Sequence, residues 1–184
     1  MVTYNHDKYL SETIESIFRQ KTNFDIKLFI GEDFSNDKSR IICKKFEKKY
    51  KGKIHVRCNE KNLGNVLNAK MTYQECISSG AKYIALCEGD DYWTDPFKLQ
   101  KQFDFLEQNS DYSLCLGNLE CVDELNDRRY NRILTNVDLN LTTESLLRSP
   151  LYGMTASSFM RMDVIRNGID NISKCYPSKR QVPR

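Results

Sequence analysis

The stretch Tyr83-Ile84-Ala85-Leu86-Cys87-Glu88-Gly89-Asp90-Asp91-Tyr92-Trp93 decides the fold. Its first five residues form the longest fully apolar run of the chain, which predicts a buried strand. Three carboxylates, Glu88, Asp90 and Asp91, follow that strand directly. Crowded carboxylates raise one another's pKa, and a hard divalent cation such as Mg²⁺ or Mn²⁺ relieves the repulsion through oxygen ligands. The stretch therefore indicates a cation site, with an ordinary polar turn rich in Asp and Gly as the alternative.

Outward from this stretch, helical and strand patterns alternate along the chain. Apolar residues at helical spacing predict helices over residues 9–20, 38–50 and 65–79, and Asp95 and Pro96 suit the N-cap and first position of another helix. Apolar runs predict strands over residues 25–32, 54–58, 82–87 and 112–121. Strands separated by helices are typical of βαβ units, so we expect an α/β fold with a mostly parallel sheet.

Ligands of parallel sheets bind at the carboxyl ends of the strands, which selects further candidates. Asp33 could accept hydrogen bonds from a nucleobase or ribose, while Ser35 or Asp37 could instead cap the helix that begins near Lys38. Tyr4 could stack on a base or simply pack against the protein. The turn Asn62-Leu63-Gly64 precedes a helix whose N-terminus could hold an anion.

Composition excludes several classes of protein. The 184 residues fit one domain, and a net charge of +3, from 28 basic and 25 acidic residues, does not favour nucleic-acid binding. The chain has seven cysteines without a CxxC pair and two histidines, which argues against a zinc site. We expect most of these cysteines to be small core residues, and a reducing cytoplasm fits them best. The longest apolar run is far shorter than the ~20 residues of a membrane span. The opening residues do not predict a secretion signal.

The order of the strand-end segments resembles the family 2 glycosyltransferases. The family's TYN matches Thr3-Tyr4-Asn5, its NxG matches Asn62-Leu63-Gly64, and its DDxSxD and DxDD match residues 32–37 and 88–91 with Glu in the first position of each. The run EGDDYWTDPFKL, residues 88–99, closely resembles a bacterial branch associated with surface polysaccharide. The resemblance is close over residues 1–112 and looser to Met162.

This resemblance implies a GT-A-like αβα sandwich with a Rossmann-like nucleotide-binding half. It implies transfer of a sugar, with inversion, from a nucleotide-diphosphate donor to a hydroxyl of a glycan or lipid-linked acceptor. It assigns metal binding to Asp91 with Asp90 and Glu88, and Mg²⁺ or Mn²⁺ as the cofactor. Nucleotide contacts fall to Thr3, Tyr4, Asn5, Asp33, Asn62, Gly64 and Asp90. Peripheral contact with the inner membrane is a further expectation, because such acceptors are often attached to lipid.

The second half of the chain departs from the family pattern. Residues 155–161 resemble the acceptor-site strand, but no clear motif supplies the general base that should follow, and Asp170 is only a guess for it. We expect one domain over residues 1–184, with a donor half at 1–112 and a partial acceptor half at 113–184. The basic tail, with Lys174, Lys179, Arg180 and Arg184, could be a solvated end or could attract anionic lipid.

A separate hypothesis is that the chain lacks a segment at each end. Only Met1 and Val2 stand where the family has an apolar strand, and the expected base is missing, so the chain could be a fragment. A nucleotide-sugar-binding module without turnover is then the main alternative to an active transferase. Two other classes of protein are alternatives. A receiver-like signalling domain needs a phosphoacceptor Asp in mid-chain and a Lys after a late strand, and this sequence has no convincing pair of that kind. A plain interaction domain would tolerate mutation of the carboxylates.

Overall fold

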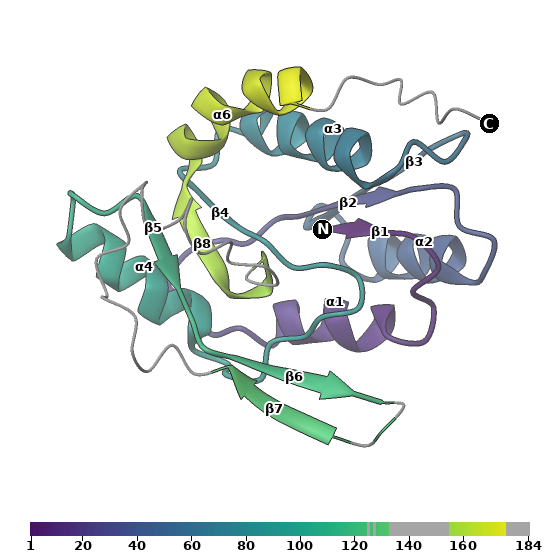
Figure 1. Ribbon diagram of the computed structural model, residues 1–184, viewed down its shortest axis with the longest axis horizontal. Coiled ribbons are helices and arrows are strands. Elements are labelled where there is room, and N and C mark those ends of the chain that lie inside the picture. The colour runs from purple at the N-terminus through teal and green to yellow at the C-terminus, as the bar shows by residue number, and fades with distance from the viewer. Residues whose placement is uncertain (125, 127, 133–154, 176–184) are drawn as a thin grey trace.

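The computed structural model describes residues 1–124, 126, 128–132 and 155–175 (Figure 1). A parallel sheet of three strands forms its first part, in the order β1 (Val2–Thr3), β2 (Leu28–Glu32) and β3 (Ile54–Cys58). Val2 pairs with Gly31, and Leu28 pairs with Ile54. All three strands point the same way, so the loops that follow them meet at one edge of the sheet.

Three further strands form an antiparallel sheet in the order β4 (Tyr83–Ala85), β8 (Ser158–Arg161) and β5 (Leu114–Leu116). Ile84 pairs with Met160 of β8, which itself pairs with Leu114 of β5. A separate hairpin joins β6 (Leu119–Asp123) to β7 (Arg128–Arg132). Strand β8 thus brings the C-terminal part of the chain beside the strand that precedes the three carboxylates.

Helices cover both faces of the sheets. Figure 1 shows α3 (Asn65–Ser78) and α6 (Met162–Cys175) on one side of β1 and β2, and α1 (Leu10–Phe18) and α2 (Ser39–Lys49) on the other. Helix α4 (Lys98–Gln108) packs against β5 and β8. A short 3-10 turn, η1 (Thr155–Ser157), leads into β8.

The core lies where these helices meet the strands. Leu10 and Ile14 of α1, Ile30 of β2 and Leu106 of α4 are fully buried, and the same cluster contains Trp93. Two cysteines, Cys43 and Cys87, are buried, and burial raises the pKa of each thiol to about 12. They behave as small core residues, as expected from the sequence.

The α/β class and the parallel arrangement of the early strands are confirmed. Two local predictions are wrong. The strand predicted over residues 112–121 is split into β5 and β6, because β5 pairs with β8 while β6 turns away to pair with β7. The helix predicted from Asp95 begins instead at Lys98, because the Asp95 carboxylate accepts the Phe97 N–H and holds a turn ahead of the helix.

Among the residues that the structure describes, no helix is long and apolar enough to cross a bilayer.

Candidate functional site

The ends of β1, β2, β3 and the chain after β4 meet at one place. The Asp33 N–H donates to the Thr3 carbonyl at 3.0 Å, and the Asn59 N–H donates to the Glu32 carbonyl at 2.9 Å. The Gly89 N–H donates to the Val2 carbonyl at 3.1 Å, which attaches the acidic loop to the end of β1. The candidates chosen by the strand-end rule are therefore neighbours in space.

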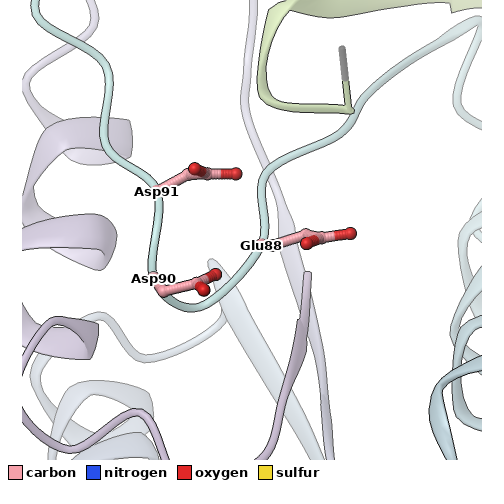
Figure 2. Close-up of side chains that lie close together, drawn as sticks. All are labelled: Glu88, Asp90 and Asp91. Atoms are coloured by element: carbon pink, nitrogen blue, oxygen red, sulfur yellow. The ribbon is translucent and has the colours of Figure 1, made fainter. Parts of the chain in front are cut away.

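Glu88, Asp90 and Asp91 form the centre of this region. One ligand oxygen of each lies within 4.8 Å of those of the other two. Figure 2 shows the three side chains leaving a single loop toward one side. Burial, reinforced by the charges of Asp90 and Glu88, raises the pKa of Asp91 to about 6. The ionised form of Asp91 is thus disfavoured first by burial and then by its two acidic neighbours.

Gly89 holds the loop close to the end of β1. A Cβ at this position would lie 2.5 Å from Thr3 Oγ1 and 2.7 Å from His6 Nδ1, so only glycine fits. The Thr13 hydroxyl of α1 donates to the Gly89 carbonyl at 3.1 Å. Close approach of the backbone therefore fixes where the two aspartates lie.

The residues after β1 divide into a buried and an exposed part. Thr3 is buried and its Oγ1 has no hydrogen-bond partner among the described residues, whereas the Tyr4 side chain is 40% exposed. Asn5 has a left-handed φ of 56°, and its side-chain oxygen accepts the Asn36 N–H at 2.9 Å. This turn leaves the Tyr4 ring open to solvent beside the end of β2.

Asp33 is almost fully buried and organises the turn at 62–64. Its Oδ1 accepts the Leu63 N–H at 2.9 Å, and its Oδ2 accepts the Gly64 N–H at 2.9 Å. The Asn62 amide donates to the Asp33 carbonyl at 3.2 Å. Asp33, Asn62 and Gly64 are therefore brought together, and the Asp33 carboxylate positions the turn that opens α3.

The loop after β2 contains a second buried acid. Glu32 is fully buried, accepts the Ser35 N–H and forms an ion pair with Arg40 at 2.6 Å. Asp37 caps the start of α2 by accepting the Ser39 N–H at 2.9 Å. Burial alone would raise the pKa of Asp37, but the backbone N–H donors of Ser39 and Asp7 outweigh it and lower the pKa. Asp37 therefore supports the first turn of α2 from one position before the N-cap, which is Lys38.

Two residues of the site were missed by sequence reasoning. Asn59 follows β3 directly, and its amide donates to Asp33 Oδ1 at 2.7 Å. The rule that selected Asp33 at the end of β2 would have selected Asn59 at the end of β3. His6 lies with its Nε2 3.8 Å from Asp90 Oδ2, beside the acidic loop. No periodicity or spacing marks His6, because the turn after β1 alone brings it there.

The far side of the site is built from Trp93 and α4. The Trp93 indole N–H donates to the Ala156 carbonyl of η1 at 2.7 Å, and the Gln102 amide donates to the Ser157 carbonyl at 2.8 Å. Lys98 lies 4.4 Å from the centroid of the Trp93 ring, and burial lowers its pKa to about 8. Residues 155–161, which resemble an acceptor-site strand, are thus held beside the loop that carries the carboxylates.

Two predictions in the C-terminal part have little structural description. Asp170 lies in α6, but its side chain is outside the described residues, as is the tail from residue 176 onward. Asp163, in the first turn of α6, is exposed and forms an ion pair with Arg166 at 2.6 Å.

A divalent cation fits the donor set of the acidic loop. Three carboxylates within reach of one ion supply the oxygen ligands that Mg²⁺ and Mn²⁺ prefer. Burial and, after it, the charges of Asp90 and Glu88 raise the pKa of Asp91, and a bound cation would offset both effects.

Comparison with known proteins identifies the family. The family model for glycosyl transferase family 2 matches residues 1–168. An uncharacterized glycosyltransferase of Methanocaldococcus jannaschii, MJ1057, is 36% identical over 125 residues, covering 67% of this chain and 41% of that protein. The minor teichoic acid biosynthesis protein GgaB of Bacillus subtilis is 36% identical over 93 residues, covering 50% of this chain and 10% of that protein.

Two solved structures share the fold. S. aureus TarS 1-349 in complex with UDP superposes with a TM-score of 0.68 at 19% identity, covering 91% of this chain and 47% of that one. The mannosyltransferase PcManGT of Pyrobaculum calidifontis, in complex with GDP-Man and Mn²⁺, gives 0.58 at 12% identity, covering 90% and 44%. The chain spans less than half the length of each of these relatives and structures. The match of the family model to residues 1–168 shows that the chain belongs to glycosyl transferase family 2.

Proposed function

We propose that this domain binds a nucleotide-diphosphate sugar and transfers the sugar to a hydroxyl acceptor in the synthesis of a bacterial surface polysaccharide. The observation that carries the proposal is the acidic loop, whose three carboxylates lie beside the ends of β1 and β2. The UDP and GDP-Man of the two structural neighbours, and the teichoic acid pathway of GgaB, support the donor class and the product class.

The nucleoside would lie over the exposed Tyr4 ring, near the turn that Asp33 holds. An aromatic face left open at a strand end suits stacking on a base. Asp33 makes two backbone bonds to the turn at 62–64, so its contribution combines positioning of that turn with contact to the base. Asp90, the most exposed of the three acids, is assigned to the ribose or phosphate side.

Asp91, with Asp90 and Glu88, would hold Mg²⁺ or Mn²⁺ against the diphosphate. When bound, the cation supplies positive charge beside the leaving group, which stabilises the negative charge that develops there. The carboxylates contribute the oxygen ligands, and Gly89 fixes their distance from the end of β1. The Mn²⁺ in the mannosyltransferase structure supports this assignment.

We infer an inverting displacement. The acceptor oxygen would bond to the anomeric carbon as the bond from that carbon to the diphosphate breaks, and a carboxylate would take the hydroxyl proton. Asp170 is the candidate for that base and stays a prediction. The strand Ser158–Arg161 and the turn before it, held by Trp93 and Gln102, would form the acceptor side.

We place this reaction in the cytoplasm, at the inner face of the membrane, where a lipid-linked acceptor would be presented. The division of the chain into a donor half at 1–112 and an acceptor half at 113–184 stays a prediction. Because the chain spans less than half of its relatives' length, further parts of a longer protein could complete the acceptor site.

The experiment measures the thermal unfolding midpoint of the chain with UDP, GDP and dTDP, each with and without Mn²⁺. A nucleotide at 100 times its Kd stabilises the folded state by about 2.7 kcal/mol, which raises Tm by roughly 5–10 °C for a chain of this length. We expect one nucleotide to produce this rise only when Mn²⁺ is present. A transfer assay with the matching nucleotide sugar then separates an active transferase from a donor-binding module without turnover.

Two variants make the test specific. Asp91→Asn should lose the Mn²⁺-dependent rise, whereas Asp111→Asn, an exposed aspartate outside the acidic loop, should keep it. A cooperative unfolding transition that no nucleotide shifts, with or without Mn²⁺, would contradict the proposed donor site.

A further inference from the structure

The loop after β2 holds an aromatic residue in a strained backbone conformation. Phe34 has a φ of 61°, in the left-handed region that a residue with a bulky side chain rarely adopts. This conformation is unfavourable for an L-residue with a side chain, and it persists only where the surrounding structure fixes it. The fold therefore retains at position 34 a conformation that the phenylalanine side chain itself opposes.

Hydrogen bonds to the residues that follow hold Phe34 in this conformation. The Ser35 N–H donates to Glu32 Oε1 at 2.6 Å, and Ser35 Oγ accepts the Asn5 N–H at 3.1 Å. The Asn36 N–H donates to Asn5 Oδ1 at 2.9 Å. The loops after β1 and β2 are thus joined to each other, and together they determine the direction in which the Phe34 side chain leaves the backbone.

Packing in the core does not account for this conformation. Phe34 is 43% exposed, and neither of the two apolar core clusters found among the described residues includes it. Phe97 is exposed to nearly the same extent, 44%, but has an ordinary φ of −107°. An exposed phenylalanine in this chain therefore does not require a left-handed backbone, and the strain at position 34 is local to the loop after β2.

The Phe34 ring rests on a guanidinium group that is itself fixed. Arg40 lies over the ring, with its Cζ 5.5 Å from the ring centroid. Arg40 Nε donates to Glu32 Oε2 at 2.6 Å, and its Nη2 donates to the Asn59 carbonyl at 2.7 Å. A cation over an aromatic face attracts the ring. Arg40 therefore supports the ring in one position, while part of the ring stays open to solvent.

This ring lies at the strand ends where the candidate site is built. Phe34 directly follows Asp33 in the chain. Thr3 of β1 pairs with Glu32 of β2, so one position further along the same register Tyr4 lies beside Asp33. Tyr4 is partly exposed as well. The ends of two adjacent strands therefore carry two open aromatic rings next to one buried carboxylate.

We propose that Phe34 is a second aromatic contact for the nucleoside of the donor, in addition to Tyr4. A ring that is held in place before the ligand arrives loses little conformational freedom on binding, and every base has a face on which an aromatic ring can pack. Strain that the fold retains at a ligand site is then the consequence of this preorganisation. The inference rests on the proposed function, because it requires a nucleotide at these strand ends.

The first measurement is nucleotide affinity. Titration calorimetry in excess Mn²⁺ gives the Kd of UDP, GDP and dTDP for the natural chain, and the nucleotide that binds most tightly is used for the variants. Phe34→Ala and Phe34→Gly should weaken its binding roughly fivefold or more, the low end of the effect of losing one base–aromatic contact. Phe34→Tyr keeps the ring and should stay within about twofold of the natural chain. Phe97→Ala, which removes an equally exposed ring outside the strand-end loops, is the matched control and should also stay within about twofold.

The second measurement is thermal unfolding of the same variants without nucleotide. At an ordinary loop position glycine is less favourable than alanine, because it loses more backbone entropy on folding. At position 34 this order should reverse, because glycine adopts a left-handed φ without steric cost, and Phe34→Gly should melt roughly 1–4 °C above Phe34→Ala. Loss of affinity in the more stable glycine variant then reports the missing ring and not a weakened fold.

Each other outcome overturns the inference. Equal affinity of Phe34→Ala and the natural chain would overturn it and leave the proposed function standing. A loss by Phe34→Tyr or by Phe97→Ala as large as that of Phe34→Ala would also overturn it, because the effect would not follow the ring at position 34. If Phe34→Gly melts below Phe34→Ala, the ring is not held against backbone strain, with the same consequence. A natural chain that binds none of the three nucleotides would overturn the proposed function and this inference with it.

Discussion

Replacing Asp91 by asparagine should stabilise the free protein while removing its ability to respond to metal and nucleotide. In the folded state Asp91 is half-buried between Asp90 and Glu88, and burial with these two charges raises its pKa to about 6. Asparagine has nearly the same shape and carries no charge. The Asp91 N–H donates to the Glu88 carbonyl and the Cys87 thiol donates to the Asp91 carbonyl; both bonds use only the backbone of residue 91, so the substitution should leave them in place.

The pH dependence follows from the direction of the shift. The unfolded chain ionises Asp91 near pH 4 and the folded chain near pH 6, so the folded state binds more protons between these values. Stability of the natural chain therefore falls as the pH rises from about 4 to about 6 and stays lower above that. After allowance for partial exposure, the ionised carboxylate costs the folded state about 1–2 kcal/mol.

The assay is thermal unfolding of the natural chain and of Asp91→Asn between pH 4.5 and pH 8. At pH 8 the variant should melt roughly 3–6 °C higher, and the difference should shrink as the pH falls below 6. Adding Mn²⁺ with a bound nucleotide should raise Tm of the natural chain only. Asp111→Asn provides the control for removal of an exposed aspartate and should show no such pH-dependent gain.

One result would refute the reasoning. If Asp91→Asn is no more stable than the natural chain at pH 8, the folded state does not disfavour the ionised Asp91 carboxylate, and the electrostatic argument for a cation site fails. If the variant is more stable but still responds to Mn²⁺ and nucleotide, the ionised Asp91 carboxylate does destabilise the fold, but the cation binds elsewhere.

Three further predictions concern the supports of the site. Gly89→Ala places a Cβ 2.5 Å from Thr3 Oγ1 and should destabilise the fold by about 1–3 kcal/mol, measured by urea unfolding; an unchanged midpoint would show that the loop moves freely from β1. Trp93→Phe removes the N–H that donates to the Ala156 carbonyl and should lower the free energy of unfolding by about 1–3 kcal/mol. Limited proteolysis should then cut the variant faster after η1, and resistance to proteolysis equal to that of the natural chain would contradict the prediction. Burial lowers the pKa of Lys98 to about 8, so the folded state binds fewer protons than the unfolded chain between about pH 8 and 10. As the pH rises through that window, the Tm of the natural chain should increase relative to that of Lys98→Met. Parallel plots of Tm against pH for the two proteins would contradict the lowered pKa.

Local sequence determined the elements and selected much of the site. The apolar run before Glu88, the helical spacing of Leu10, Ile14 and Ile17, and the strand at 54–58 each depend on neighbouring residues, so their patterns are readable without a structure. The strand-end rule selected Tyr4, Asp33 and the acidic loop for the same reason, since each follows the end of a strand.

Only the tertiary structure decided how these pieces meet. The split of residues 112–121 depends on the partner strand of each half. The first half, β5, pairs with β8, some forty residues further along the chain, and the second half, β6, pairs with β7. His6 reaches Asp90 through a turn, and Trp93 holds η1 across the core, so neither contact leaves a local pattern. Periodicity along a chain records which side of an element is buried, whereas pairing between distant segments depends on the free energy of the whole fold.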